Sequence, residues 1–394
     1  MSTAVVDYPG QAFRGDPPPL PEGPVARVRL PSGDPVWLVT GYAEVRSALN
    51  HPMLARISEE GADDPKAGSV TLSGRRHAHR TLQLDGPPHT SLRALASKAF
   101  TAQRVAGLRD RIQELTDTYL DRMEETGKPA DLVSTLAYPL PIAVICELLG
   151  VPPEDQKLFV EWTDKLVTIT GVRPEEVAAA RGSLVAYLRD RLEAKRADPG
   201  DDLLSVWAAV QESDDRLVDE EVLHLAEMVL VGGFETTVNA IGAGMWRLFQ
   251  NPDELDALKA DPGLIPGAVE ELLRFQPQAP MFLIFIARDD FELGGVTIRK
   301  GEGVMPLPFA ANRDPSRFPD PDRFDVRRKG NGHITFGHGP HVCLGAALAR
   351  MELEVAIGTL LRRFPGLRPA ASLTELDWRS DRLVNGLREL PVAW

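Results

Sequence analysis

The hydrophobic positions of this chain recur mostly at three-to-four-residue spacing, which is the period of amphipathic helices. From Pro88 onward, this spacing predicts helices over segments 91–100, 102–126, 130–149, 154–170, 174–197, 201–211 and 266–275. The same pattern returns at 344–364, after a glycine-rich loop. We therefore expect a helical part over roughly 88–275 and 344–364.

The longest helical pattern covers 219–250, and its middle is apolar almost all round. Such a helix should be buried on most sides and cross a whole domain, with Asp219 as its N-cap. Glu235 and Thr236 interrupt the apolar middle, where an acid and a hydroxyl are costly to bury without a use. The pair Gly232-Gly233 lowers helix propensity there and allows a local opening.

Short β-like runs fall in two regions. Segments 25–30 and 36–40 flank a proline- and glycine-containing turn and predict a hairpin, and further runs occur over 282–287, 291–293, 296–298 and 304–307. We find no repeat, low-complexity linker or sharp change in composition. The expected fold is therefore mainly α with a small β region (roughly 25–40 and 282–310), in a single domain over 1–394.

Composition narrows the class of protein. Of the 394 residues, 43% are hydrophobic and 26% charged, which is ordinary for a soluble globular protein. The net charge of −13 argues against nucleic acid as a main partner. No apolar run is long enough to span a membrane, and no signal-peptide pattern begins the sequence, so we expect a cytoplasmic protein. The two cysteines exclude a disulfide framework, and Cys146, in an apolar stretch, should be a buried core thiol.

Candidate chemistry concentrates in the loop Phe336-Gly-His-Gly-Pro-His-Val-Cys343-Leu-Gly345, just before the helical pattern that begins at Leu344. Glycines let such a loop adopt positive φ and approach a bulky partner closely. The free N–H groups of the following helix should lower the pKa of the Cys343 thiol and favour the thiolate. A thiolate in this setting is a nucleophile or a metal ligand.

The surrounding residues favour a metal ligand. His341 and His338 share the loop with Cys343, which is a poor arrangement for a cysteine–histidine catalytic pair. Structural zinc and iron–sulfur clusters need several Cys or His ligands at suitable spacing. A lone thiolate under a helix start fits axial ligation of haem, and an inert loop cysteine is the remaining alternative.

The loop resembles the signature Phe-x-x-Gly-x-x-x-Cys-x-Gly of the cytochrome P-450 family. Three further motifs stand in the family's order: Asp85-Gly-Pro-Pro-His89-Thr-Ser-Leu-Arg93, Gly232-Gly-Phe-Glu235-Thr236-Thr237 and Glu271-Leu-Leu-Arg274. The similarity is to soluble bacterial members and covers essentially the whole chain. It implies the cytochrome P-450 fold, with the long central helix over a haem b cofactor.

The resemblance also implies residue roles. Cys343 would be the metal ligand, Thr236 would orient water or the reacting oxygen, and Glu235 would relay protons inward. The other implied haem contacts are His89, Arg93 and His341 at the propionates, with Phe336, Gly337 and Gly345 beside the thiolate. Glu271 and Arg274 would form a structural network with Arg323 that holds the cysteine loop.

Phe285 departs from the family pattern, because relatives usually carry there an arginine that pairs a haem propionate. Arg288 lies three residues on, and an odd spacing along a strand points a side chain to the other face. We therefore expect another cation to pair this propionate, such as an arginine of the segment 75–80.

The resemblance implies a monooxygenase that uses O2 and two electrons to hydroxylate or epoxidise a small, mostly apolar organic molecule in specialised metabolism. The sequence shows no flavin or nicotinamide motif, so ferredoxin and ferredoxin reductase would supply the electrons. Lys98, Arg104, Arg109 and the segment 327–329 are either a basic docking patch or scattered solvated charge. The implied substrate pocket includes Met228, Val231, Gly232, Met281, Phe282, Leu283 and Val384. Alternatives are an atypical oxidation, such as aryl coupling or ring closure, and a non-catalytic haem sensor.

Overall fold

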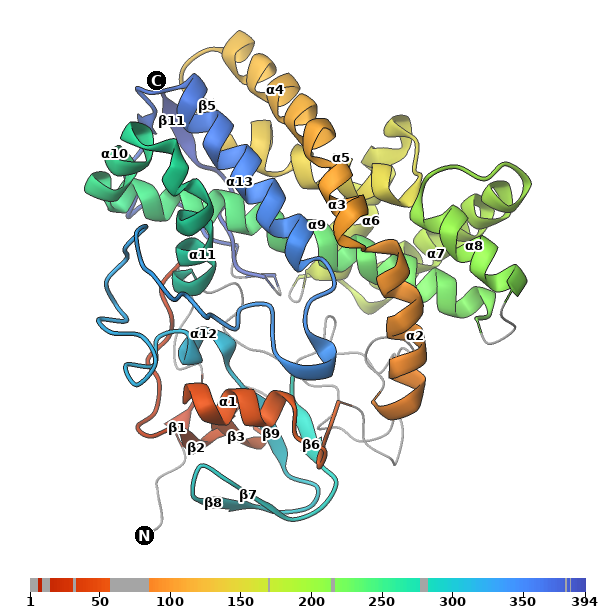
Figure 1. Ribbon diagram of the computed structural model, residues 1–394, viewed down its shortest axis with the longest axis vertical. Coiled ribbons are helices and arrows are strands. Elements are labelled where there is room, and N and C mark those ends of the chain that lie inside the picture. Colours follow the sequence, from red (N-terminus) through yellow and green to blue (C-terminus); the bar gives the residue numbers. More distant parts are fainter. Residues whose placement is uncertain are drawn as a thin grey trace.

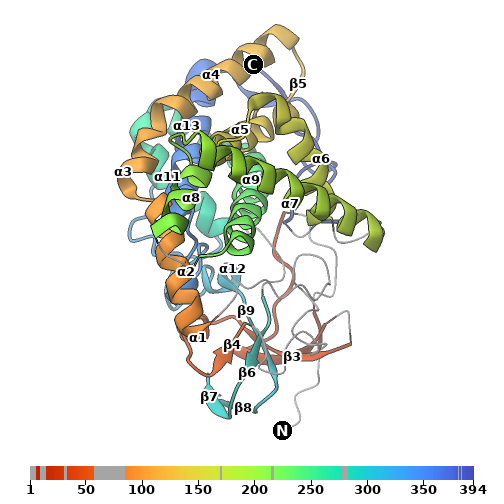
Figure 2. The same cartoon turned by 90° about the vertical axis from the view of Figure 1, so that its right-hand side faces the viewer.

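A computed structural model describes residues 6–8, 15–30, 33–56, 85–168, 171–213, 217–276, 283–379, 381–382 and 384–394. A helical body fills one end of the molecule and the main sheet lies at the other, as two perpendicular views show (Figures 1 and 2). The expectation of a mainly helical fold with a small β region is confirmed. The predicted pocket residues Met281 and Phe282, and the arginines of segment 75–80, lie outside the described residues.

Helices make up most of the described chain. The earlier ones are α1 (Tyr42–Leu49), α2 (Gly86–Ala99), α3 (Ala102–Gly107), α4 (Arg109–Thr126), α5 (Pro139–Leu149), α6 (Gln156–Val167) and α7 (Pro174–Ala197). The later ones are α8 (Leu203–Ser213), α9 (Asp219–Gln250), α10 (Pro252–Ala260), α11 (Ile265–Phe275), α12 (Pro308–Ala311) and α13 (Ala346–Arg363).

Helix α9 is the axis of the helical body, as the sequence predicted. It has 32 residues and is therefore about 48 Å long. It packs against α5, α7 and α13, and Figure 1 shows α13 lying across it. One detail of its start differs from the prediction: the N-cap is Val218, whose N–H donates to Glu221 at 3.1 Å. Asp219 forms an ion pair with Arg196 instead.

Two predicted helices are divided in the structure. The segment 102–126 breaks at Leu108, between α3 and α4. The segment 130–149 begins as strand β5 (Ala130–Asp131), and a π-helical turn (Val133–Ala137) precedes α5. The cause is Asp131, whose carboxylate accepts the N–H groups of Val133 at 3.0 Å and of Leu390 at 2.7 Å. The spacing of apolar residues does not reveal this pairing, because the C-terminal segment is distant in sequence.

The main sheet has six strands in the order β1-β2-β3-β9-β6-β4. They are β1 (Val6–Asp7), β2 (Val25–Arg29), β3 (Pro35–Val39), β4 (Leu54–Ala55), β6 (Phe285–Ala287) and β9 (Gly303–Pro306). Strands β2 and β3 form the predicted hairpin. A separate hairpin joins β7 (Phe291–Leu293) and β8 (Val296–Ile298), and β5 pairs in a small sheet with β10 (Arg368–Pro369) and β11 (Pro391–Ala393).

The hydrophobic core divides in the same way. A large cluster joins the helices and includes Cys146, which is buried as predicted, and two smaller clusters lie around the main sheet.

Among the described residues, no helix combines the length and apolar character needed to cross a membrane. The chain between β9 and α13 returns from the sheet to the helical body, and its last part is the cysteine loop (Figure 1).

Candidate active site

The cysteine loop is fixed by its own backbone. The N–H of Cys343 donates to the carbonyl of Phe336 at 2.8 Å, and the N–H of Gly337 donates to Ile334 at 2.9 Å. Gly339 has φ of +77°, and a Cβ there would lie 3.0 Å from the carbonyl oxygen of Leu49. This close approach to the end of α1 explains the need for glycine at 339.

The thiol of Cys343 is exposed toward the cavity, yet many protein atoms surround it. Desolvation raises its pKa above the ordinary value, although the N–H of Gly345 and the charges of Arg93 and Arg350 lower it in part. The expected lowering by the helix start is therefore wrong for the protein alone. The reason is that desolvation of a thiolate outweighs one N–H donor and two cations at the loop.

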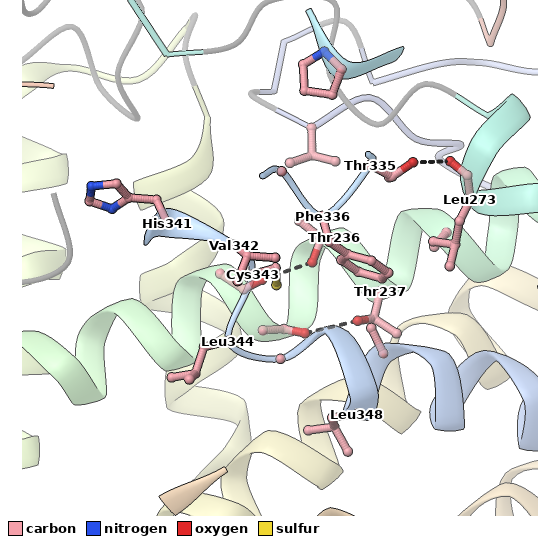
Figure 3. A pocket seen from close by; sticks show the side chains of 18 of the residues that line it. Thr236, Thr237, Leu273, Thr335, Phe336, His341, Val342, Cys343, Leu344 and Leu348 are labelled. Carbon is pink, nitrogen blue, oxygen red and sulfur yellow. Dashed lines mark hydrogen bonds between the residues drawn. The ribbon is translucent and has the colours of Figure 1, made fainter. Parts of the chain in front are cut away.

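The loop and helix α9 enclose a cavity of about 490 Å³. Thr236 on α9 and Cys343 on the loop both line it, together with Phe336 (Figure 3). Gly337 and Gly345 also reach it, as do Ile145, Met228, Leu273, Leu348 and Leu353. A thiol in a wide, largely apolar space is the arrangement that a flat metal cofactor needs.

Polar groups gather at one edge of this cavity. His341 Nε2 lies 3.1 Å from Asp85 Oδ1, and the rings of His341 and His89 have centroids 3.9 Å apart. Arg93 donates to the carbonyl of Val342 in the cysteine loop. The structure thus brings together His89, Arg93 and His341, the three residues predicted at the propionates.

The charge balance at this edge is cationic. Burial raises the pKa of Asp85, but hydrogen bonds from His341 and from the N–H of Arg56 outweigh it and hold the pKa below its ordinary value. Desolvation and the nearby His341 and Arg93 lower the pKa of His89 to about 4. Nε2 of His89 and Nε of Arg56 are buried without a hydrogen-bond partner among the described residues. Orphaned buried donors beside a thiol-lined cavity fit a cofactor that carries carboxylates.

Glu271 and Arg274 form the structural network predicted for them. Arg274 Nε lies 2.8 Å from Glu271 Oε2, both side chains are fully buried, and Arg274 also donates to the carbonyls of Asn312 and Pro321. Helix α11 thereby holds the segment that leads to the cysteine loop.

The third member of this network is Arg328, and the prediction of Arg323 is wrong. Arg328 Nε lies 3.1 Å from Glu271 Oε1 and its guanidinium donates to three carbonyls of the loop. The side chain of Arg323 points to solvent near Asp325, and only its carbonyl joins the network. The loop bends between the two arginines, so sequence order does not show which one turns inward.

Thr236 faces the cavity and its hydroxyl donates to the carbonyl of Gly232 at 2.9 Å. Thr237 donates likewise to Gly233 at 3.1 Å. Helix α9 stays continuous through both glycines, so the expected local opening is absent. Gly233 packs so closely that a Cβ would lie 2.8 Å from Ile145.

Glu235 does not line the cavity within the described residues, because it lies about 100° round the helix from Thr236. It is buried, with Oε1 3.4 Å from Arg382 Nη1 and 3.4 Å from the amide of Asn239. Arg382 also pairs with Asp164 on α6. The predicted acid–hydroxyl pair therefore points in two directions.

Four of the predicted pocket residues lie at the cavity, and their role in binding substrate stays a prediction. Met228, Gly232, Leu283 and Val384 line the cavity. Val231 is not among the described residues that do so and packs against the helical core, because it lies on the opposite side of α9 from Thr236.

The sequence did not predict two charged residues that line the cavity, Arg56 and Glu352. Arg56 follows strand β4 and no motif marks it. Glu352 on α13 is fully buried, and desolvation raises its pKa to about 8. The helical period places Glu352 on the same face as Leu348 and Val355, so a charge on an apolar face was the available signal.

Comparisons with known proteins agree with this geometry. The family model "Cytochrome P450" matches residues 264–369. Cytochrome P450 107B1 of Saccharopolyspora erythraea is 44% identical over 379 residues, covering 94% of this chain and 92% of that protein. Mycinamicin IV hydroxylase/epoxidase of Micromonospora griseorubida is 42% identical over 376 residues, covering 94% of this chain and 92% of that protein.

A solved structure extends the likeness to the whole fold. The LnmA cytochrome P450 hydroxylase of the leinamycin biosynthetic pathway of Streptomyces atroolivaceus has a TM-score of 0.90 and 44% identity, covering 99% of this chain and 100% of that one. The site and fold define a haem-thiolate oxidoreductase. The chain belongs to the cytochrome P450 family, its cofactor is haem b, and it is a monooxygenase.

Proposed function

We propose that this monooxygenase hydroxylates or epoxidises a small, mostly apolar molecule of specialised metabolism. The observation that carries the proposal is the joint lining of one cavity by Cys343, Thr236 and apolar side chains, among them Met228, Leu283 and Val384. A mostly apolar wall with few polar groups binds hydrophobic organic molecules. The hydroxylase and hydroxylase/epoxidase relatives support oxygen insertion as the reaction.

Cys343 would hold the haem iron, and His89, Arg93 and His341 would hold the haem propionates. When bound, haem supplies the iron that activates O2 for insertion into the substrate. Thr236 would orient a water or the reacting oxygen from the cavity wall, because its hydroxyl oxygen can accept a hydrogen bond while its O–H donates to the carbonyl of Gly232. Glu235 exchanges protons from behind the helix, where Arg382 and Asp164 connect it to α6 and the surface.

Ferredoxin and ferredoxin reductase supply the electrons in this proposal, and the protein is cytoplasmic and folds as a single domain over 1–394. Lys329 is exposed and supports a basic docking surface for an acidic ferredoxin, whereas the exposed Arg109 and Arg327 are paired with Glu354 and Glu254. Arg328 is excluded from that surface because it is buried against Glu271. Arg104 is engaged by Asp201.

A spectrum of the reduced protein with CO tests the haem-thiolate site. We expect absorption at the position characteristic of cysteinate–CO haem, and its absence would contradict the proposal. A library of apolar metabolites should then contain ligands that shift the iron spin state. With a ferredoxin and its reductase present, such a ligand should gain one oxygen atom, detected by mass spectrometry under labelled O2.

A further inference from the structure

The cavity edge beside Phe285 has a cation that no sequence motif marks. Strands β4 and β6 are antiparallel, with Leu54 opposite Ala287 and Ala55 opposite Ile286. One step further, this register places Arg56 opposite Phe285. Directly opposite residues of an antiparallel pair project to the same face of the sheet. A side chain at position 56 therefore reaches the region that an arginine at position 285 would reach.

The contacts of Arg56 agree with this register. Its guanidinium carbon lies 5.5 Å from the centre of the Phe285 ring, which is a cation–π distance. Arg56 lines the cavity with Arg93, His341 and Cys343, whereas Phe285 is buried in the sheet and is not among the described residues of that lining. Phe285 thus forms a platform under the arginine.

Among the residues that the structure describes, Arg56 also has no counter-ion of its own. Its N–H donates to Asp85 at 2.8 Å, but that carboxylate already receives His341 at 3.1 Å and has Arg288 at 3.8 Å. Nε of Arg56 is buried with no hydrogen-bond partner among the described residues. Desolvation lowers the pKa of Arg56 to about 10, although Asp85 partly offsets this, so the group is still charged at neutral pH. A buried cation with an orphaned donor requires an anion from the cavity side.

Arg288, the nearest arginine in sequence to Phe285, does not meet this need. Its contact with Asp85 is long, more than a third of its side chain is exposed, and it is not among the described residues lining the cavity. We infer that Arg56 replaces the arginine absent at position 285 and pairs the haem propionate on the β6 side. In this protein the cation lies on the β4 side of the β4–β6 pair instead of on β6, and it projects from the same face of the sheet.

Haem retention tests this inference without any measurement of activity. Arg56→Gln removes the charge, and the loss of a charge-assisted hydrogen bond should speed haem transfer from the ferric holoenzyme to apomyoglobin on the order of tenfold. The midpoint potential should fall as well, because an unpaired propionate stabilises ferric iron. The matched control is Arg288→Gln, which also removes a positive charge beside Asp85. It should change the rate of haem transfer by no more than about twofold and leave the midpoint potential close to that of the unchanged protein.

The double variant Arg56→Gln/Phe285→Arg returns a cation to the other strand and should restore haem retention to within about threefold of the unchanged protein. If Arg56→Gln alone does not accumulate with haem, recovery of the haem-loaded protein in the double variant tests the inference instead. Equal haem loss from Arg56→Gln and Arg288→Gln, or no rescue in the double variant, would overturn the inference. The inference rests on the haem-thiolate site, and the CO spectrum of the unchanged protein separates the two: a missing signal refutes the site, whereas equal haem loss refutes only the role of Arg56.

Discussion

The guanidinium of Arg382 lies 3.4 Å from the carboxylate of Glu235, in a buried pair on the side of α9 away from the cavity. Burial lowers the pKa of Arg382, but Glu235 and Asp164 outweigh it and raise the pKa above its ordinary value. Thr236, the next residue after Glu235, faces the cavity. The acid and the hydroxyl are therefore neighbours in sequence that serve opposite sides of one helix.

Arg382→Met should lower the free energy of unfolding by about 3 kcal/mol, because it leaves the carboxylate of Glu235 buried without its cation. Urea unfolding of the holoenzyme measures this. Asp164→Asn is the matched control on the same arginine, and since Asp164 is half-exposed it should cost within about 1 kcal/mol. Equal costs would show that the buried pair has no special weight.

Thr236→Ala should retain haem and bind spin-shifting ligands, but release hydrogen peroxide instead of oxidised product. Coupled product formation should fall on the order of tenfold, because the hydroxyl that positions the proton donor is gone. The ratio of product to electrons consumed measures this. Thr236→Ser keeps the hydroxyl and should stay largely coupled. Full coupling in Thr236→Ala would remove the role assigned to the hydroxyl.

Arg328→Gln should destabilise the protein by about 3 kcal/mol and reduce haem incorporation, because Glu271 loses a buried partner and the loop loses its tie. Arg323→Gln is the control, and it should cost less than about 1 kcal/mol because its side chain is exposed. Thermal unfolding and haem content of both variants decide between them. A larger effect at Arg323 would contradict the network of Glu271, Arg274 and Arg328.

Glu352→Gln should remove a pH dependence of stability. The pKa of Glu352 is about 8 in the folded protein and about 4.5 in the unfolded chain, so between these values only the folded protein holds the proton. The stability that this carboxyl group contributes is therefore complete below about pH 4.5 and is lost as the pH rises to about 8, by on the order of 5 kcal/mol.

Urea midpoints at pH 5 and pH 8.5 measure this effect. The unchanged protein and Glu352→Gln should be similar at the lower pH, and the variant should be more stable at the higher pH. Parallel pH profiles for the two proteins would mean that Glu352 is not protonated in the folded state near neutral pH.

Much of the fold and site follows from local sequence. The bounds of α7, α9, β7 and β8 match the predicted segments, because apolar periodicity reports which face of an element is buried. The spacing of Phe336, Gly339, Cys343 and Gly345 likewise marked the cysteine loop, since its shape depends on glycines close in sequence. Helix and strand propensity and the preferences of turn residues act over a few neighbouring residues, so the local sequence is enough to recognise them.

Only the tertiary structure decided the contacts between distant segments. It selected Arg328 over Arg323 as the partner of Glu271, joined Glu235 to Arg382, and set Arg56 beside Phe285. Each depends on how two segments far apart in sequence are placed: a loop bend, a helix rotation or a strand register. The sequence by itself determined that Cys343 stands in a haem-thiolate loop. The packing of strands and helices determined which charged side chains surround it, because electrostatic partners are chosen by distance in space.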